Sequence, residues 1–154
     1  FISVHVLGIF EPVMDLHPEL FFFTPLIAAM AGNVGVQSSA IIVQGLANNT
    51  IIGPVVERLL KELSLSLLNG VILSVILLAG SYFLLGYEIH VGYTVSIALL
   101  SVIIMASLIG TFIPIILNKY GVDPALATGP FITTSNDILG ILTYFTIAKI
   151  ILGI

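Results

Sequence analysis

Long apolar runs, separated by short polar segments, set the pattern of this chain. About 20 helical residues span the hydrocarbon core of a bilayer, and four runs reach that length. They cover residues 20–47, 63–86, 92–118 and 129–154. The alternating strands of roughly ten residues that build a membrane barrel do not occur. The pattern therefore predicts an all-α membrane protein, in which helices satisfy their backbone hydrogen bonds internally.

Shorter segments precede and separate these spans. Residues 1–10 are apolar but too short to cross, and we interpret them as the end of a truncated first helix. Residues 11–19 and 119–128 are expected to be loops, and residues 48–62 a polar connector that ends in an amphipathic helix. Residues 1–154 are thus expected to form a single transmembrane domain of five helices, the first truncated, with no cytosolic domain present.

Composition supports a membrane domain and excludes several functions. Of 154 residues, 58% are hydrophobic and 8% are charged, whereas a soluble surface needs far more charge. The net charge of −4 is not the basic footprint of a nucleic-acid-binding protein. Without cysteine, the chain has no disulfides and no thiolate metal site. We recognise no nucleophile–base pair and no phosphate-binding glycine loop, so we expect no enzyme activity.

Basic residues predict the orientation in the membrane. Three of the four lysines and arginines lie in segments 48–62 and 119–128, and the loops at the other ends of the spans contain none. Because cytoplasmic loops carry an excess of Lys and Arg, we expect these two segments to be cytoplasmic. Lys149, near the far end of the last span, is the exception, and its long side chain can reach the interface.

A carboxylate interrupts the last apolar run. Asp137 lies well inside it, where an ionisable group costs roughly 2.5–3.5 kcal/mol on insertion scales. No Lys or Arg lies at the same depth to pair with it. Its neighbours offer hydroxyl and amide groups, which suit a hard cation. Since intramembrane carboxylates mostly line a water-filled path or bind an ion, we expect an ion or proton pathway here.

Polar residues follow one helical face in several spans, at the spacing that places side chains above one another. The last span carries Thr133, Asp137, Gly140 and Tyr144 on such a face. The span that begins at residue 20 carries Asn33, Gln37 and Gln44 on one face, which continues to Asn48 just beyond it. A polar face either lines a pathway or bonds to neighbouring helices. For Asn33 and Gln37 both interpretations stay open.

Two glycines flank Asn33 in the middle of a span. Gly32 and Gly35 each cost up to about 1 kcal/mol in a helix interior. Such a run marks a hinge, a close helix crossing, or a place where backbone carbonyls face a cavity. These three interpretations also stay open.

Two motifs, about ninety residues apart, resemble a known family. The first is Pro-Leu-Ile at 25–27 with Gly-Asn-Val-Gly-Val-Gln-Ser-Ser-Ala at 32–40. It resembles the second transmembrane helix of MgtE-type magnesium channels. The second is Asp-Pro-Ala-Leu-Ala-Thr-Gly-Pro-Phe-Ile-Thr-Thr at 123–134, with Asp-Ile-Leu-Gly at 137–140 and Tyr-Phe at 144–145. It resembles the family's last helix and the loop before it. The order of spans and loops matches along essentially the whole chain.

The resemblance implies a homodimer with the pore on its two-fold axis, in the plasma or inner membrane of a prokaryote. It implies that Asp137 and its twin bind a largely hydrated Mg²⁺, for which Mn²⁺ or Ca²⁺ could substitute, with help from the backbone carbonyls of Thr133 and Gly140. Family members usually carry cytosolic regulatory domains, which we expect to be missing from this chain. The residues expected to line the pore are Asn33, Gln37, Gly32, Gly35, Thr134 and Tyr144.

These inferences favour a magnesium channel pore that conducts hydrated Mg²⁺ down its electrochemical gradient, but two other functions stay open. A proton-coupled divalent cation carrier would use Asp137 as a relay. A non-transport membrane assembly subunit would show no ion flux at all. Flux that persists without a pH gradient separates the channel from the carrier.

Overall fold

The computed structural model describes residues 2–51, 54–127 and 129–154 and confirms the all-helical prediction. The helices are α1 (Ile2–Ile9), α2 (Glu11–Leu16), α3 (Glu19–Ala47), α4 (Val55–Phe83), α5 (Ile89–Lys119), the short 3-10 helix η1 (Pro124–Ala127) and α6 (Pro130–Leu152). Among them, α3, α4, α5 and α6 are long and apolar enough to cross a membrane. They correspond to the four full spans expected from the hydrophobic pattern.

Two boundaries differ from expectation. Helix α4 begins at Val55 rather than at 63, because no proline or glycine interrupts residues 55–69 and the expected connector helix runs straight into the span. The expected loop at 11–19 contains the short helix α2. Its first turn holds Glu11 and Pro12, and an acidic residue and a proline are both favourable at a helix start.

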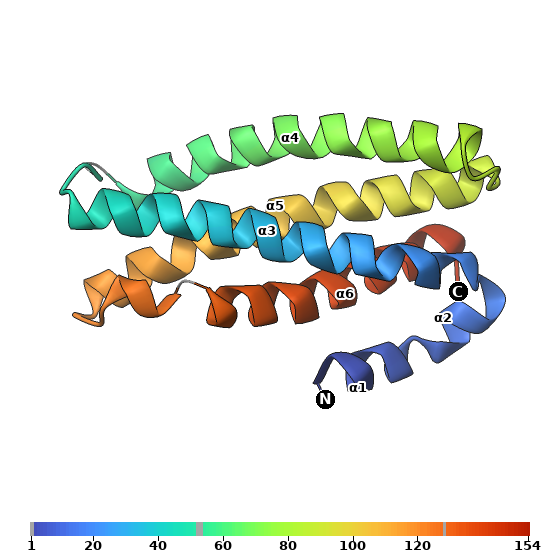
Figure 1. Ribbon diagram of the computed structural model, residues 1–154, viewed down its shortest axis with the longest axis horizontal. Helices are drawn as coiled ribbons and strands as arrows, with labels where there is room; N and C mark the ends of the chain where they lie inside the picture. The colour runs from blue at the N-terminus through green and yellow to red at the C-terminus, as the bar shows by residue number, and fades with distance from the viewer. Residues whose placement is uncertain (1, 52–53, 128) are drawn as a thin grey trace.

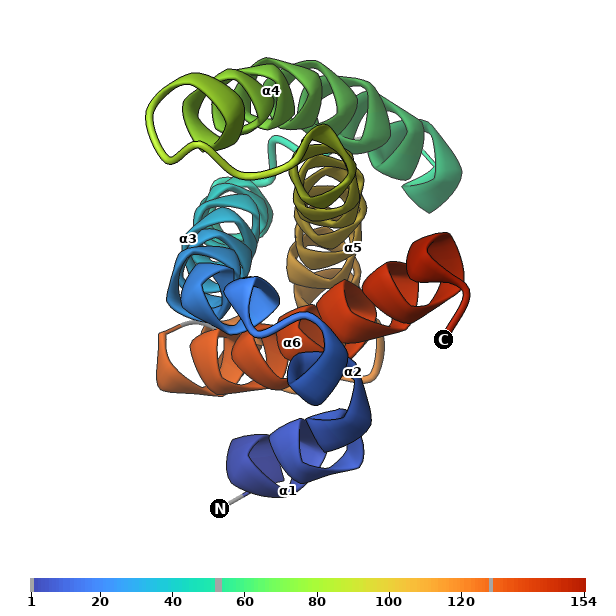
Figure 2. The same cartoon turned by 90° about the vertical axis from the view of Figure 1, so that its right-hand side faces the viewer.

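Helix α5 is at the centre of the bundle and packs against α3, α4 and α6. Helix α4 lies on the outside, where it packs almost wholly on α5 (Figure 2). It exposes an apolar face along most of its length, including Leu65, Leu68, Ile72 and Ile76. Such a face suits contact with lipid, because the helix backbone needs no outside partner there.

The two segments that hold most of the basic residues lie at the same end of the bundle. Figure 1 shows the α3–α4 connection and η1 together at one end, and α2 with the α4–α5 turn at the other. This is the arrangement that results when every long helix crosses the membrane once. We refer below to the first of these as the basic end.

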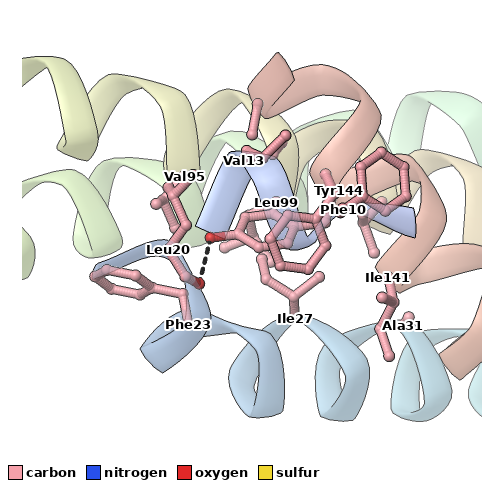
Figure 3. Close-up of a cluster of buried hydrophobic side chains, with 14 of the residues drawn as sticks. Phe10, Val13, Leu20, Phe23, Ile27, Ala31, Val95, Leu99, Ile141 and Tyr144 are labelled. Carbon is pink, nitrogen blue, oxygen red and sulfur yellow. Dashed lines mark hydrogen bonds between the residues drawn. The ribbon is translucent and has the colours of Figure 1, made fainter. Parts of the chain in front are cut away.

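The aromatic core lies away from the basic end, where α1, α3 and α6 meet. The rings of Tyr144 and Phe145 meet edge to face with centroids 4.7 Å apart, and Phe10 stacks on Phe145 at 5.4 Å. The hydroxyl of Tyr144 donates to the backbone carbonyl of Leu20 at 2.8 Å (Figure 3). This bond anchors the C-terminal half of α6 to the first turn of α3.

Candidate functional site

Asp137 lies where α6 passes closest to α3. Its side chain is partly buried. A Cβ atom added to Gly32 would lie 2.9 Å from Asp137 Oδ1 and 3.2 Å from Thr133 Cγ2. Those distances are tighter than ordinary contacts, so the absence of a side chain at Gly32 makes room for the carboxylate.

The carboxylate of Asp137 has no partner in the described part of the chain. No hydrogen bond or salt bridge to it occurs among these residues, and the one salt bridge found there joins His17 and Glu19 at 3.0 Å. The basic side chains lie near helix ends, as with Lys119 at the last turn of α5 and Lys149 at the last turn of α6. A charge in this position is therefore not compensated within the single chain.

A hollow of about 710 Å³ opens beside this carboxylate, on the side of the basic end. Asn33 and Gln37 reach it from α3, and both are exposed. Thr133 and Thr134 reach it from α6, and Asp137 follows Thr133 by one helical turn. The full lining is Asn33, Val36, Gln37, Gly129, Pro130, Thr133 and Thr134. The structure thus brings together at one hollow the polar residues that the sequence places on two different helices.

The other predicted glycines pack helices rather than line the hollow. A Cβ atom on Gly35 would overlap the amide of Asn136, and one on Gly110 would overlap the carbonyl of Gly35. A Cβ atom on Gly140 would lie 2.8 Å from that of Ala31. Of the three interpretations left open for the Gly32–Gly35 run, the structure therefore shows a close crossing of α3, α5 and α6, centred on Gly35.

Asn136 fills the centre of this crossing. Its side chain is completely buried, and neither amide atom has a hydrogen-bond partner among the described residues. Buried polar groups are usually hydrogen-bonded, so burying this amide without a partner costs free energy. Asn136 points into the bundle, whereas Asp137, the next residue along α6, is partly exposed on a different face.

Tyr144, which we expected to line the pore, does not reach the hollow. It shares a helical face with Asp137, but its ring is fully buried in the aromatic core at the other end of α6. At that depth the face meets Leu20 and Phe10 instead of the hollow. We therefore leave Tyr144 out of the pore proposed below.

One functional candidate was missed by the sequence analysis. Glu62, expected in the polar connector, lies inside α4 and accepts hydrogen bonds from Ser38 of α3 and Ser107 of α5. A signal for it exists: Glu62, Ser66, Gly70 and Ser74 follow one another at four-residue intervals, and the last three are buried. A stripe of small residues marks a packed helix face, which places Glu62 on the same face.

Membrane-length helices, a polar hollow and a carboxylate with no partner among the described residues are features typical of membrane transport proteins. A profile of the MgtE family, described as divalent cation transporters, matches residues 24–147. The chain belongs to this family.

Similar bacterial proteins agree with this assignment. The protein named magnesium transporter MgtE of Bacillus subtilis (strain 168) is 38% identical over 148 residues, covering 96% of this chain and 33% of the relative. The protein of that name from Thermus thermophilus is 32% identical, and the match covers 98% of this chain and 33% of the relative. The one from Enterococcus faecalis is 36% identical, and the match covers 91% of this chain and 31% of the relative. The chain spans about a third of the length of these relatives. All three relatives are named as magnesium transporters rather than as enzymes.

Proposed function

We propose that this chain is the pore domain of a Mg²⁺ channel, formed by two copies around a two-fold axis. The observation that carries the proposal is Asp137, a carboxylate beside a polar hollow with no partner among the residues that the structure describes. A charge that no side chain compensates is suited to an ion that comes and goes. The names of the similar proteins point to magnesium as that ion.

The chemistry around Asp137 suits Mg²⁺ in particular. This ion loses its water reluctantly and is usually held by one or two carboxylates while it keeps several waters. In the proposal, Asp137 and the backbone carbonyls of Thr133 and Gly140 hold the hydrated ion. Asn33, Gln37 and Thr134 line the path to it, and Mn²⁺ or Ca²⁺ could take the place of Mg²⁺.

A second copy is part of the proposal because one chain offers too few ligands. In the part of the chain that the structure describes, no three His, Asp or Glu residues come together to hold a metal ion. Two-fold symmetry is the commonest way for identical chains to assemble, and it would place two Asp137 carboxylates at one axis. The polar hollow would then be half of a channel.

We further propose that the basic end faces the cytoplasm. Segments 48–62 and 119–128 hold three of the four basic residues, and the end of α3, the start of α4 and η1 lie together at that end. The hollow opens on the same side, so an ion would leave the site for the cytoplasm through it. Cytosolic regulatory domains of the kind that the resemblance implies would act at this end.

Ion uptake into liposomes tests the proposal, with Asp15→Asn as the matched control. Asp15 is exposed on α2 and undergoes the same loss of charge. We expect the parent chain and Asp15→Asn to take up Mg²⁺, and Asp137→Asn to lose uptake. Parental rates in Asp137→Asn, or no uptake by the parent, would overturn the proposal. Uptake that stops when the pH gradient is collapsed would favour the proton-coupled carrier instead.

Single cysteines test the dimer, because the chain has no native cysteine. Thr134→Cys lines the hollow, while Val71→Cys lies on the exposed face of α4. We expect a short bifunctional thiol reagent to cross-link two copies of the first variant and not of the second. The opposite result would place the dimer interface on α4.

A further inference from the structure

Glu62 joins three helices through one carboxylate oxygen. Ser38 of α3 and Ser107 of α5 each donate a hydrogen bond to Glu62 Oε1, both at 2.7 Å. The two serine oxygens lie 3.3 Å apart. Both serines are buried and Glu62 is partly buried, so these bonds lie inside the bundle rather than at a solvated surface. We call these three residues the Glu62 triad.

The triad holds the turn of α3 that contributes to the hollow. Ser38 directly follows Gln37, and successive residues of a helix point about 100° apart. Gln37 therefore faces the hollow while Ser38 faces α4 and α5. Because α4 packs almost wholly on α5, the bond from Ser38 to Glu62 is a direct link between α4 and the pore-lining helix.

A carboxylate is a costly choice for a link that serves packing alone. Within the described residues Glu62 forms no salt bridge, although Arg58 precedes it by one turn of the same helix. Two hydroxyl groups are thus the partners that offset its charge. Hydrogen bonds to a charged acceptor are shorter and stronger than neutral ones, so the triad holds its three helices in a defined register.

We propose that Glu62 is a positioning residue for the pore. It fixes the turn of α3 that carries Gln37 relative to α5, which also packs against the helix that carries Asp137, and so sets how the channel discriminates among hydrated divalent ions. This inference rests on the proposed function. It adds to that function a residue on the outermost helix, remote from the hollow.

Three variants of Glu62 separate the effects of its charge, of its side-chain length and of its hydrogen bonds. Glu62→Gln keeps an oxygen that can accept both hydroxyl bonds, Glu62→Asp keeps the charge but shortens the side chain, and Glu62→Ala removes both. Glu57→Ala is the matched control, since Glu57 is exposed near the start of the same helix. Ser38→Ala with Ser107→Ala removes the link from the other side.

The measurement is uptake of Mg²⁺ and of Mn²⁺ into liposomes over a range of concentrations, with folding checked by thermal unfolding. We expect Glu62→Ala, Glu62→Asp and the double serine variant to change the Mg²⁺ to Mn²⁺ uptake ratio by roughly tenfold, which is within the range for mutations that act on a site without touching its ligand. Glu62→Gln, which can accept the same two bonds without the charge, should change the ratio less than Glu62→Ala does, and Glu57→Ala should match the parent. A residue with only a structural role would lower thermal stability and leave the ratio of the folded protein unchanged.

A second readout needs no ion. In a Gln37→Cys background, Glu62→Ala should change the rate at which a water-soluble thiol reagent modifies the cysteine, and Glu57→Ala should not. An unchanged ratio together with an unchanged modification rate would overturn the inference. So would failure of every triad variant to fold while Glu57→Ala folds, because Glu62 would then serve folding alone. If instead the parent takes up no Mg²⁺, the proposed function itself fails.

Discussion

Asp137 and Glu62 are both carboxylates within membrane-length helices, and they differ in whether α3 offers them a hydrogen-bond donor. Asp137 meets α3 at Gly32, which offers it no side chain, and it has no bonded partner among the described residues. Glu62 meets the same helix at Ser38, which donates a hydrogen bond to it. In the proposals above, the bonded carboxylate holds structure, while the unbonded one is available to a mobile ion.

The two carboxylates also differ in what removing their charge should do to stability. An unpaired buried charge carries a desolvation cost that its removal relieves, whereas a bonded one leaves its donors unsatisfied when it is lost. Substitutions at the two positions should therefore have opposite effects. The first prediction below tests the Asp137 side of that contrast and the others test the helix contacts around it, from the largest expected effect to the smallest.

The largest effect should be the loss of stabilisation by Mg²⁺ in Asp137→Asn. An ion that binds only the folded state at a hundred times its Kd adds about 2.7 kcal/mol to the free energy of unfolding. Mg²⁺ should raise the free energy of unfolding of the parent by this amount and should not raise that of Asp137→Asn. Without Mg²⁺, the variant should be at least as stable as the parent. Thermal unfolding in detergent, with and without Mg²⁺, measures both. Equal stabilisation of parent and variant would erase the contrast with Glu62.

Next in size should be the effect of Gly110→Ala on folding. The added Cβ atom would overlap the backbone carbonyl of Gly35, which cannot move aside as a side chain can. Overpacking of this kind costs about 1–3 kcal/mol. Gly80→Ala is the control, because nothing lies within 4 Å of its Cβ position. Thermal unfolding should show a lower transition for the first variant only.

A smaller effect, and one on transport rather than folding, is expected for Gly32→Ala. The new Cβ atom would press on Asp137 Oδ1 and on the methyl group of Thr133, both of which belong to side chains that can shift. The carboxylate should then tilt away from its present position, reducing Mg²⁺ uptake by roughly tenfold, or about 1.4 kcal/mol. Uptake at the parental rate in the folded variant would show that the close contact has no role in ion binding.

The smallest effect should follow from Tyr144→Phe. This change removes the hydrogen bond to the carbonyl of Leu20 and keeps the buried ring. Interhelical hydrogen bonds in membrane proteins average about 0.6 kcal/mol. We expect a slight loss of thermal stability and unchanged Mg²⁺ uptake. A large loss of uptake would return Tyr144 to the pore surface, where the sequence pattern had placed it.

Hydrophobic patterning was sufficient to predict the four spans, because in a membrane the length of an apolar run nearly determines the element. The start of α4 was harder, since the amphipathic turns before residue 63 look like a connector until the continuous helix is seen. The pattern also placed Asn33 and Gln37 on one face of their helix and Thr133 on the face that carries Asp137, and these three residues line or adjoin one hollow.

Contacts that need three helices were beyond the sequence. Glu62 finds Ser38 and Ser107 because α4 and α3 both lie along α5, and no spacing in one helix encodes that meeting. Tyr144 illustrates the complementary problem. Periodicity predicts the face of α6 on which it lies, but that face meets different neighbours at different depths of the bundle.

Both α5 and α6 contact α3 most closely at Gly35, so a tilt of α3 is considered about this point. If α3 tilts about this point, each residue moves in proportion to its distance along the axis. Gly32 is three residues from the pivot and Ala47 is twelve, so the end of the helix travels about four times as far as the turn that faces Asp137. A tilt of this kind would displace the basic end most and the turn that faces Asp137 least.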